Sequence, residues 1–328
     1  MIFADFFKGI LPRRATRPKE TQPAFSFQPI GFSDFLTLDV PPREMLLNPI
    51  LPERSLAMLY APRGIGKTLL SLSIGLAVGS GSPLLRWQAP RQRRVLYVDG
   101  EMPLVSLQER LRLISTRLGV GIPNDGFRIL AADQTNNGIS LGSEAGQKAI
   151  EPLLGDVDLL ILDNLSTLCT ASESASDAWV PMQNWLLGLR RKGIAVLLVH
   201  HAGNNGRQRG TSRREDALDT VIALRRPEDY SPEQGARFEV HFEKLRNRVD
   251  ADGAVPFEAS FVGDAWSAQD LRPPIFKQAL ELFQDGLTVR EVAAQLGISK
   301  TEAGRLRLRA VSEGLVVTAM NDHCLLQS

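Results

Sequence analysis

The sequence predicts an α/β protein built on a doubly wound, mostly parallel sheet, with a small helical domain at the C-terminal end. Two observations carry this prediction. Between residues 55 and 199, apolar runs of strand length alternate with segments of helical length. From residue 269 onward, the chain changes to short amphipathic helices separated by turns. A chain of 328 residues has room for both parts.

The first predicted unit is a strand, a glycine-rich loop and a helix. Residues 55–60 are apolar, residues 61–68 read Ala-Pro-Arg-Gly-Ile-Gly-Lys-Thr, and residues 69–78 suit a helix. The glycines let backbone N–H groups turn inward, and the helix N-terminus adds further N–H groups, so this loop should cradle phosphate. We expect ATP and Mg²⁺ here, with Lys67 on the phosphates and Thr68 on the metal ion. The residues predicted to contact the nucleotide are Arg63, Gly64, Ile65, Gly66, Lys67, Thr68 and Leu69.

Three later strands are predicted to end in polar residues. These residues are Asp99 and Glu101 after residues 95–98, Asp163 at the end of residues 157–163, and His200 and His201 after residues 193–199. Because the carboxyl ends of parallel strands meet at one edge of a sheet, we expect the side chains to gather beside the phosphate loop. Asp163 would order the water shell of Mg²⁺, whereas its alternative role is to cap the next turn. Each histidine has a plain alternative as a hydrogen-bonding residue at the sheet rim.

Composition and charge restrict the kind of protein. The formal net charge of +1 argues against a globally basic surface, so any contact with nucleic acid must come from local patches. The two cysteines, Cys169 and Cys324, lie far apart and lack metal-ligand spacing, which favours a reducing compartment. No apolar run reaches membrane-spanning length. We therefore expect a cytoplasmic protein without a membrane partner.

Three regions are predicted along the chain. Residues 1–31 are rich in proline and charge and are interpreted as a flexible basic tail. The apolar start of this tail is either a short amphipathic docking segment or a frayed end. Residues 32–268 form the sheet domain, and residues 269–328 form the C-terminal domain.

A basic loop follows the last of these strands. It carries Arg207, Arg209, Arg213 and Arg214 among glycines and asparagines. A basic loop at the ligand-binding edge of the sheet can track a phosphate backbone, so Arg207, Arg213 and Arg214 are candidates for contact with single-stranded DNA. The alternative is a solvated loop. Residues 167–178 are the second candidate wall of the same channel.

The C-terminal region is predicted to be a winged helix-turn-helix domain. Its expected helices cover residues 275–283, 288–296 and 300–313, with Thr288 and Glu291 forming a capping box and residues 315–318 and 323–326 pairing as a wing. The basic side chains expected to face a DNA groove are Lys300, Arg305, Arg307 and Arg309. The alternative is a protein-docking domain, since the charges of this region nearly balance.

Residues 41–261 resemble the RecA-like ATPase family. They are most similar to the branch that contains the RepA-type hexameric replicative helicases of broad-host-range plasmids. The motifs that carry this resemblance are residues 61–68, the strand end at Asp99-Gly-Glu101, residues 159–165, residues 199–202, Arg209-Gly-Thr-Ser212, and the late strand that ends in Lys244-Leu-Arg246.

The resemblance implies roles for several residues. Glu101 would activate the attacking water, and either His200 or His201 would sense the γ-phosphate. Lys244 and Arg246 would reach into the site of a neighbouring subunit, with Arg209 as a second candidate for that role. The alternative for the Lys-x-Arg pair is an exposed basic strand edge, because residues two apart share one face of a strand.

The function expected from these observations is an ATP-driven DNA motor that forms a ring, as a hexamer, and serves as a replicative helicase of a plasmid, phage or mobile element. Single-stranded DNA would be its track, and duplex DNA a second partner. A replication initiator or a primase is the expected protein partner. Three alternatives stay open: a recombination or repair ATPase, an ATP-dependent DNA-binding regulator, and a nucleotide-switched scaffold.

Overall fold

The computed structural model describes residues 28–118, 126–136, 138–169, 179–202, 216–227, 230–246, 255–263, 265–271, 273–312 and 314–316. The chain divides into two compact units, Met1–Pro42 and Arg43–Ser328. In the first unit the short helix α1 (Phe32–Leu36) has no buried residue. Most of the predicted N-terminal tail lies outside the described residues, and the domain boundaries at residues 31 and 269 stay predictions. Within these ranges, no helix combines the length and the apolar character needed to span a membrane.

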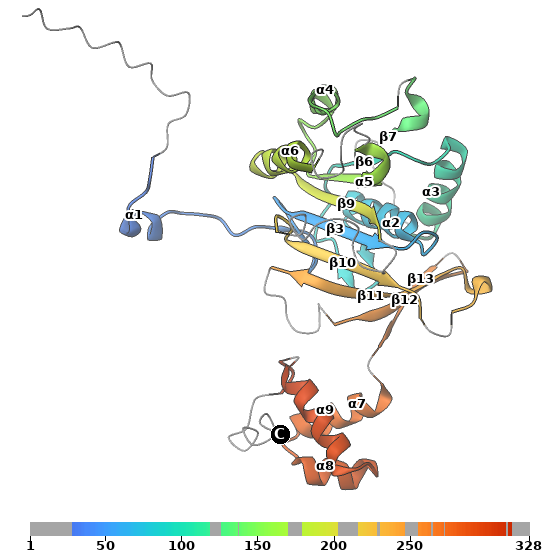
Figure 1. The fold of residues 1–328 in the computed structure, drawn as a ribbon. Coiled ribbons are helices and arrows are strands. Elements are labelled where there is room, and N and C mark those ends of the chain that lie inside the picture. The colour runs from blue at the N-terminus through green and yellow to red at the C-terminus, as the bar shows by residue number, and fades with distance from the viewer. Residues whose placement is uncertain are drawn as a thin grey trace, which may run out of the picture. The chain divides into compact units, whose positions relative to one another are not determined.

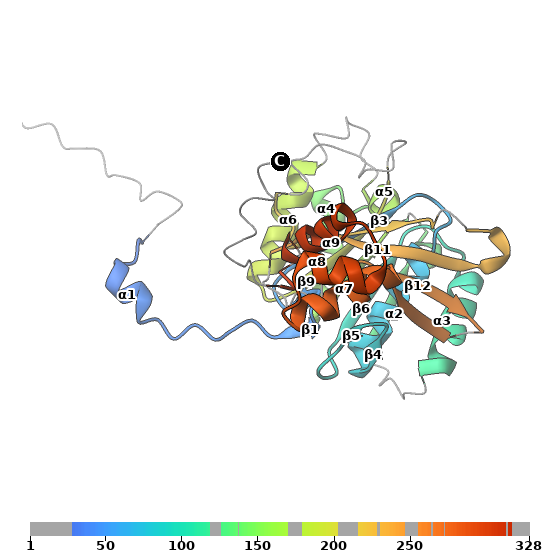
Figure 2. The same cartoon turned by 90° about the horizontal axis from the view of Figure 1, so that it is seen from below.

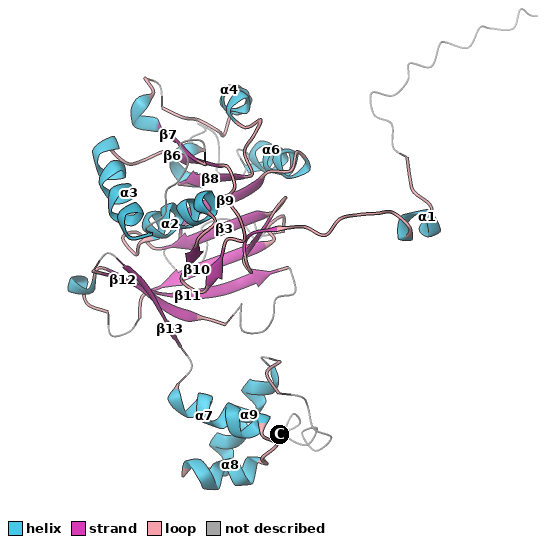
Figure 3. Ribbon diagram, turned by 180° about the vertical axis from the view of Figure 1, so that it is seen from behind, coloured by secondary structure: helices cyan, strands magenta, loops and turns pink. Residues whose placement is uncertain are grey.

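A nine-stranded sheet forms the centre of the second unit (Figure 1), in the order β13-β12-β11-β10-β3-β9-β8-β6-β7. The six parallel strands are β3 (Leu56–Ala61), β6 (Val95–Asp99), β7 (Phe127–Ala131), β8 (Leu159–Asp163), β9 (Ala195–His201) and β10 (Thr220–Arg225). Three antiparallel strands extend the sheet at β10, namely β11 (Ala236–Leu245), β12 (Phe257–Val262) and β13 (Ala265–Asp270). The predicted α/β class with a mostly parallel sheet is therefore confirmed, and Figure 3 shows the strands side by side.

Helices cover both faces of the parallel strands. One face carries α2 (Lys67–Ser80) and α3 (Leu104–Leu118), and the other carries α4 (Glu144–Ile150), α5 (Leu165–Leu168) and α6 (Trp179–Arg191). Two small hairpins, β1 (Met45–Leu47) with β2 (Leu51–Pro52) and β4 (Pro83–Leu84) with β5 (Trp87–Gln88), pack into the α2 side. Strand side chains alternate between the two cores, as a period of two requires: Leu59 lies in the first core, and Met58 and Tyr60 lie in the second.

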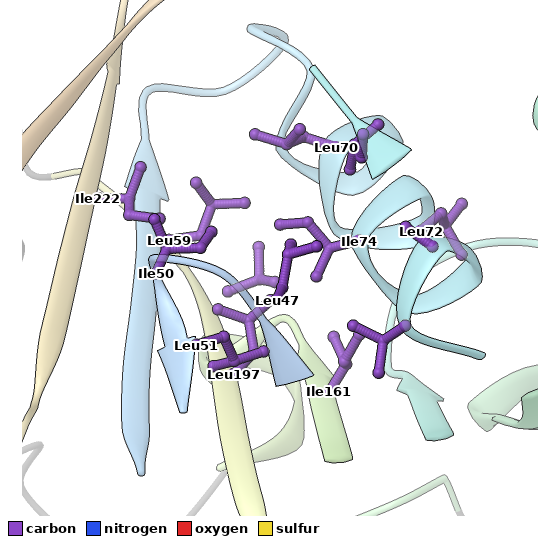
Figure 4. Close-up of a cluster of buried hydrophobic side chains, with 14 of the residues drawn as sticks. Leu47, Ile50, Leu51, Leu59, Leu70, Leu72, Ile74, Ile161, Leu197 and Ile222 are labelled. Carbon is purple, nitrogen blue, oxygen red and sulfur yellow. The ribbon is translucent and has the colours of Figure 1, made fainter. Parts of the chain in front are cut away.

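Helix α2 holds the phosphate loop against the sheet. Figure 4 shows Leu70 and Ile74 of α2 facing a layer of strand side chains that includes Leu59. Each such fully buried side chain stabilises the fold by roughly 1.5–3 kcal/mol. The helix approaches the sheet closely at Gly75, where an added Cβ would lie 2.5 Å from the ring of Phe127. The start of α2 is therefore fixed relative to the strand ends.

The carboxyl ends of the parallel strands are level with one another. Ala61 is in register with His201, and Asp99 is in register with Asp163. Strand β11 runs the other way, so its first residues lie at this edge and Leu245 lies beside Thr220 at the opposite edge. The edge of the sheet formed by the carboxyl ends of the parallel strands therefore carries the predicted polar residues. The opposite edge, formed by the amino ends of these strands, carries the late basic residues.

Three helices follow the sheet and pack around a small core of their own (Figure 2). They are α7 (Pro274–Gln284), α8 (Val289–Leu296) and α9 (Lys300–Ser312). The predicted capping box is confirmed, because Thr288 Oγ1 accepts from the Glu291 N–H while the Glu291 carboxylate accepts from the Thr288 N–H at 2.7 Å. The three predicted helices are present, whereas the winged helix-turn-helix identity stays a prediction, because the wing, except residues 315 and 316, lies outside the described residues.

Candidate active site

The loop between β3 and α2 has the backbone of an anion cradle. Gly64 has φ +74° and Gly66 has φ +123°, conformations that residues with a Cβ rarely adopt. A Cβ on Gly66 would also lie 3.1 Å from the ring of Phe238 on β11. Both glycines are therefore required, one by its backbone and the other by its backbone and its close neighbour. Ala61, where glycine is commoner in such loops, is accommodated without a positive φ.

Lys67 is the first residue of α2, and its side chain reaches back to the start of this loop. Its Nζ donates to the carbonyl oxygens of Ala61 at 3.0 Å and Pro62 at 2.9 Å, and the side chain is buried. Burial lowers the pKa of Lys67, and the negative charges of Asp163 and Glu101 oppose that change. Within the described residues this ammonium group donates to two neutral carbonyls, which it can exchange for phosphate oxygens.

Asp163 is buried in a network of hydroxyl groups. Tyr97 donates to Asp163 Oδ2 at 2.6 Å, Ser71 donates to the same oxygen at 3.4 Å, and Thr68 also hydrogen-bonds to this carboxylate. Burial raises the pKa of Asp163, and the hydrogen bond from Tyr97 is the largest influence against that rise. The pairing of Thr68 with Asp163 brings together the two residues predicted to hold a metal ion.

The turn after β6 separates the roles of its two carboxylates. Asp99 Oδ1 accepts from the N–H groups of Glu101 at 3.1 Å and Met102 at 2.6 Å, which fixes the turn. Burial raises the pKa of Asp99 to about 6, and the nearby charges of Asp163 and Glu101 act in the same direction. Glu101, in contrast, is exposed at the sheet edge. Asp99 therefore shapes the turn, and Glu101 is the carboxylate that a substrate can reach.

Asn164 connects Glu101 to His201. It follows Asp163 directly, and its Nδ2 donates to Glu101 Oε2 and lies 3.2 Å from His201 Nε2. Glu101 Oε2 and His201 Nε2 are themselves 3.7 Å apart. Burial lowers the pKa of His201, and the charge of Lys67 acts in the same direction. Of the two predicted histidines, His201 is thus the one beside Glu101, while His200 is buried within β9.

Sequence reasoning did not single out three residues of this site: Asn164, Tyr97 and Arg226. Arg226 follows β10 and donates from Nη2 to the Gly64 carbonyl oxygen at 2.7 Å, although the two residues are far apart in the chain. Asn164 stands next to the predicted Asp163, so its position was visible in the sequence while its partners were not. Tyr97 looked like one apolar residue of a buried strand.

The other residues predicted for the nucleotide differ in exposure. Arg63 is exposed, Ile65 is buried, and Leu69 is partly buried against the first core. The four arginines of the predicted DNA loop, Arg207, Arg209, Arg213 and Arg214, lie outside the described residues, as does most of the loop predicted as its second wall.

Lys244 and Arg246 lie away from the phosphate loop of their own chain. Lys244 is in register with Val221 near the start of β10. The backbone N–H of Arg246 donates to the Asp219 carbonyl oxygen at 2.9 Å, and its guanidinium donates to the Asp216 carbonyl oxygen. Both residues therefore occupy the opposite edge of the sheet.

The basic residues of α9 divide into two groups. Lys300, Arg305 and Arg309 are exposed, although Arg309 lies with its Cζ 4.6 Å from the centre of the Phe276 ring. Arg307 is 9% exposed and packs its guanidinium 5.1 Å from the Phe283 ring centre. The prediction that Arg307 faces a groove is therefore wrong, because its place on the helix turns it into the three-helix core.

The residues at the edge fit a nucleotide with a divalent cation. The two positive-φ glycines and the N-terminus of α2 form a backbone that suits an anion, and Lys67, which donates to the carbonyls of Ala61 and Pro62, supplies a positive charge. Thr68 and Asp163 would supply oxygen ligands to the cation, directly or through water. Across the described ranges, no group of three or more His, Cys, Asp or Glu side chains is placed to hold a metal ion by itself. Mg²⁺ usually takes only one or two protein oxygens beside phosphates and water, which matches this donor set.

The fold and the site define a P-loop ATPase, with the phosphate loop and the acidic strand end at one edge of an α/β sheet. Comparison with protein families agrees, because the model described as an AAA domain matches residues 21–207. This match covers more than half of the chain, and the chain therefore belongs to this family.

Comparisons with individual proteins are less informative. The crystal structure of the RadB recombinase is similar, with 16% sequence identity and a TM-score of 0.46. The alignment covers 68% of this chain and 93% of that chain. No curated protein matches the sequence.

Proposed function

We propose that this ATPase is a ring-forming motor that translocates on DNA, and specifically a replicative helicase of a plasmid, phage or mobile element. The observation that carries the proposal is the separation of two sets of residues. Lys67, Glu101 and Asp163 meet at one edge of the sheet, whereas Arg246 lies at the other edge. A ring in which each subunit completes its neighbour's site would use both edges at once.

The residues of the first edge divide the work of hydrolysis. Bound ATP with Mg²⁺ would supply the phosphoryl group and neutralise much of its charge. Lys67 would bind the β- and γ-phosphate oxygens in place of the carbonyls of Ala61 and Pro62. Glu101, held beside Asn164, would take the proton of the attacking water. His201 lies next to this carboxylate and is the better candidate for a γ-phosphate sensor.

The second edge supports a role in a neighbouring site. Lys244 and Arg246 lie too far along β11 to serve the phosphate loop beside Ala236 in the same chain. A head-to-tail contact, which closes into a ring such as a hexamer, would carry them to the γ-phosphate of the next subunit. The plain alternative is a solvated basic strand end.

Two surfaces are proposed for DNA. The loop with Arg207, Arg213 and Arg214 would contact single-stranded DNA beside the γ-phosphate sensor. Arg209 of the same loop is the second candidate, after Lys244 and Arg246, for reaching the site of a neighbouring subunit. The exposed residues Lys300, Arg305 and Arg309 would contact duplex DNA through α9. A replication initiator or a primase is the proposed protein partner.

The first experiment tests the ATPase part. Lys67→Ala should abolish ATP hydrolysis and leave the circular dichroism spectrum unchanged, because it removes a buried charge but no apolar contact of the core. Glu101→Gln should still bind ATP and hydrolyse it at least about 100-fold more slowly. Lys192→Ala and Glu144→Gln are matched controls, since both side chains form exposed ion pairs. Hydrolysis by Glu101→Gln at the wild-type rate would remove Glu101 from the role of base.

The second experiment tests the motor part. The wild-type protein should displace a strand from a forked DNA in the presence of ATP, and Lys67→Ala should not. A second candidate function is an ATP-dependent DNA-binding regulator, which is favoured by the separate hydrophobic core of α7, α8 and α9. ATP-dependent binding of duplex DNA without strand displacement would support the regulator, or a recombination or repair ATPase, and exclude the helicase.

A further inference from the structure

Asn164 is a buried polar residue of the site with several hydrogen-bond partners. It is 2% exposed, lies between β8 and α5, and its side chain has partners on three different elements. These partners are the N–H groups of Ser166 at 3.0 Å and Thr167 at 3.2 Å, the carboxylate of Glu101, and His201 Nε2 at 3.2 Å. One amide thus caps a helix and contacts the two side chains proposed for catalysis and sensing.

The helix cap fixes which way the amide points. Two backbone N–H groups of α5, those of Ser166 and Thr167, donate to Asn164 Oδ1, so this atom must be the oxygen. The NH₂ group therefore faces Glu101 and His201. One N–H donates to Glu101 Oε2, and the contact with His201 Nε2 is favourable only when that nitrogen is an acceptor.

This geometry selects one form of His201. An acceptor at Nε2 places the single proton of the neutral ring on Nδ1. His201 Nδ1 is buried and has no hydrogen-bond partner within the described part of the chain, so no other contact there competes in this selection. The charged groups around the ring are Lys67, Arg63, Glu101 and Asp163, and burial and Lys67 lower the pKa of His201. A lowered pKa favours the neutral form of the His201 ring, which agrees with the hydrogen-bond geometry.

We propose that Asn164 is a positioning residue, which holds the Glu101 carboxylate toward the attacking water and keeps His201 as the neutral Nδ1–H tautomer. This inference rests on the proposed role of Glu101 in ATP hydrolysis. The Glu101 side chain is exposed, so few other contacts restrict it. The hydrogen bond from the Asn164 amide therefore fixes the orientation of its carboxylate. Within the described residues, the hydrogen bonds of Asn164 reach neither the phosphate loop nor Lys67, so its loss should affect turnover more than nucleotide binding.

Two substitutions separate positioning from helix capping. Asn164→Asp keeps an oxygen for the N–H groups of Ser166 and Thr167 but loses the donor toward Glu101 and His201. Asn164→Ser also keeps a good cap and is too short to reach either side chain. Asn164→Ser should unfold within a few degrees of the wild type, whereas Asn164→Asp buries a new carboxylate against Glu101 and should unfold at a lower temperature, which thermal melts check. Asn164→Ala loses both roles and serves as the reference for a damaged cap.

The kinetic test compares turnover with nucleotide affinity. For Asn164→Asp and Asn164→Ser, kcat for ATP should fall about 100-fold, the loss typical of a catalytic group that is misplaced by about 1 Å. KM should stay within about two-fold of the wild type, because no phosphate-binding group is altered. Wild-type kcat in both variants, with a loss only in Asn164→Ala, would overturn the inference and leave Asn164 as a helix cap.

A second test does not depend on activity. The ¹⁵N spectrum of histidine-labelled, ligand-free protein should show the Nδ1–H tautomer for His201, with His201→Gln identifying its signals. In Asn164→Asp the new carboxylate accepts instead of donating, so His201 Nε2 should become protonated. An unchanged Nδ1–H tautomer in this variant would overturn the inference. If Lys67→Ala and Glu101→Gln retained full ATPase activity, the proposed function would fail, while the tautomer test would still judge Asn164.

Discussion

Arg226 binds the phosphate loop through the carbonyl oxygen of Gly64. The guanidinium donates from Nη2 across 2.7 Å, and its Cζ lies 3.6 Å from the centre of the Tyr230 ring. Gly64 is one of the two loop residues with positive φ, so its peptide orientation decides where the following N–H groups point. Arg226 thus connects the end of β10 to the shape of the anion cradle.

This contact predicts the effect of Arg226→Ala. Loss of a charged hydrogen bond, worth about 1.5–3 kcal/mol, should loosen the loop and weaken the binding of a fluorescent ATP analogue about ten-fold. Arg225→Ala is the matched control, because Arg225 is exposed and pairs with Glu243 at 3.2 Å instead. Equal affinity in the two variants would show that the contact with Gly64 does not order the loop.

Asp99 should make stability depend on pH. Burial raises its pKa to about 6, above the value of about 3.9 expected in the unfolded chain. The folded state therefore binds the Asp99 proton more tightly than the unfolded chain does. Protonated Asp99 adds to the free energy of unfolding below pH 4, and this addition is lost as the pH rises to 6. Asp99→Asn keeps the acceptor for the Glu101 and Met102 N–H groups and should lack this loss.

Urea unfolding of both proteins between pH 4 and pH 7 measures this difference. The stability of the wild type relative to Asp99→Asn should decline across the window and then level off. A constant difference over the same range would mean that Asp99 has an ordinary pKa in the folded protein.

Arg246 should act on a neighbouring subunit. Arg246→Ala should lower turnover while leaving the affinity of a subunit for ATP unchanged, because Arg246 lies at the opposite edge of the sheet from its own loop. Mixing Arg246→Ala with Lys67→Ala protein should restore activity at interfaces that pair an intact loop with an intact arginine. A steady-state ATPase assay over a range of mixing ratios measures the recovery. No recovery at any ratio would assign Arg246 a role within its own chain.

Two arginines of α9 should respond differently to substitution. Arg305→Ala should weaken duplex DNA binding and reduce the dependence of log K on log salt by roughly 0.9, the value for one lost phosphate contact. Arg307→Ala should instead lower stability by about 1 kcal/mol, because its guanidinium packs on Phe283 within the helical core. Salt titrations of binding and thermal melts of both variants separate the two effects. Unaltered duplex binding by Arg305→Ala would favour protein docking for this domain.

The helices and strands were largely predictable because their signals are local. The glycine pattern around Lys67, the apolar strands and the polar residue that ends each of them depend on neighbours in the chain, and the structure has these elements within a few residues of the prediction. Helix α4 is short, since it stops at Ile150 and continues as a tighter turn with Pro152, which has no N–H to donate.

The sequence by itself determined which chemical groups reach the ligand-binding edge, because strand direction and strand ends follow from local pattern. Only the tertiary structure decided which of them touch. Tyr97 meets Asp163 across 66 residues, and Arg226 meets Gly64 across 162. Asn164 meets Glu101 and His201 because three strands end at one level. Such pairs depend on the register of the strands and the packing of the helices, which the spacing of residues along a single chain does not specify.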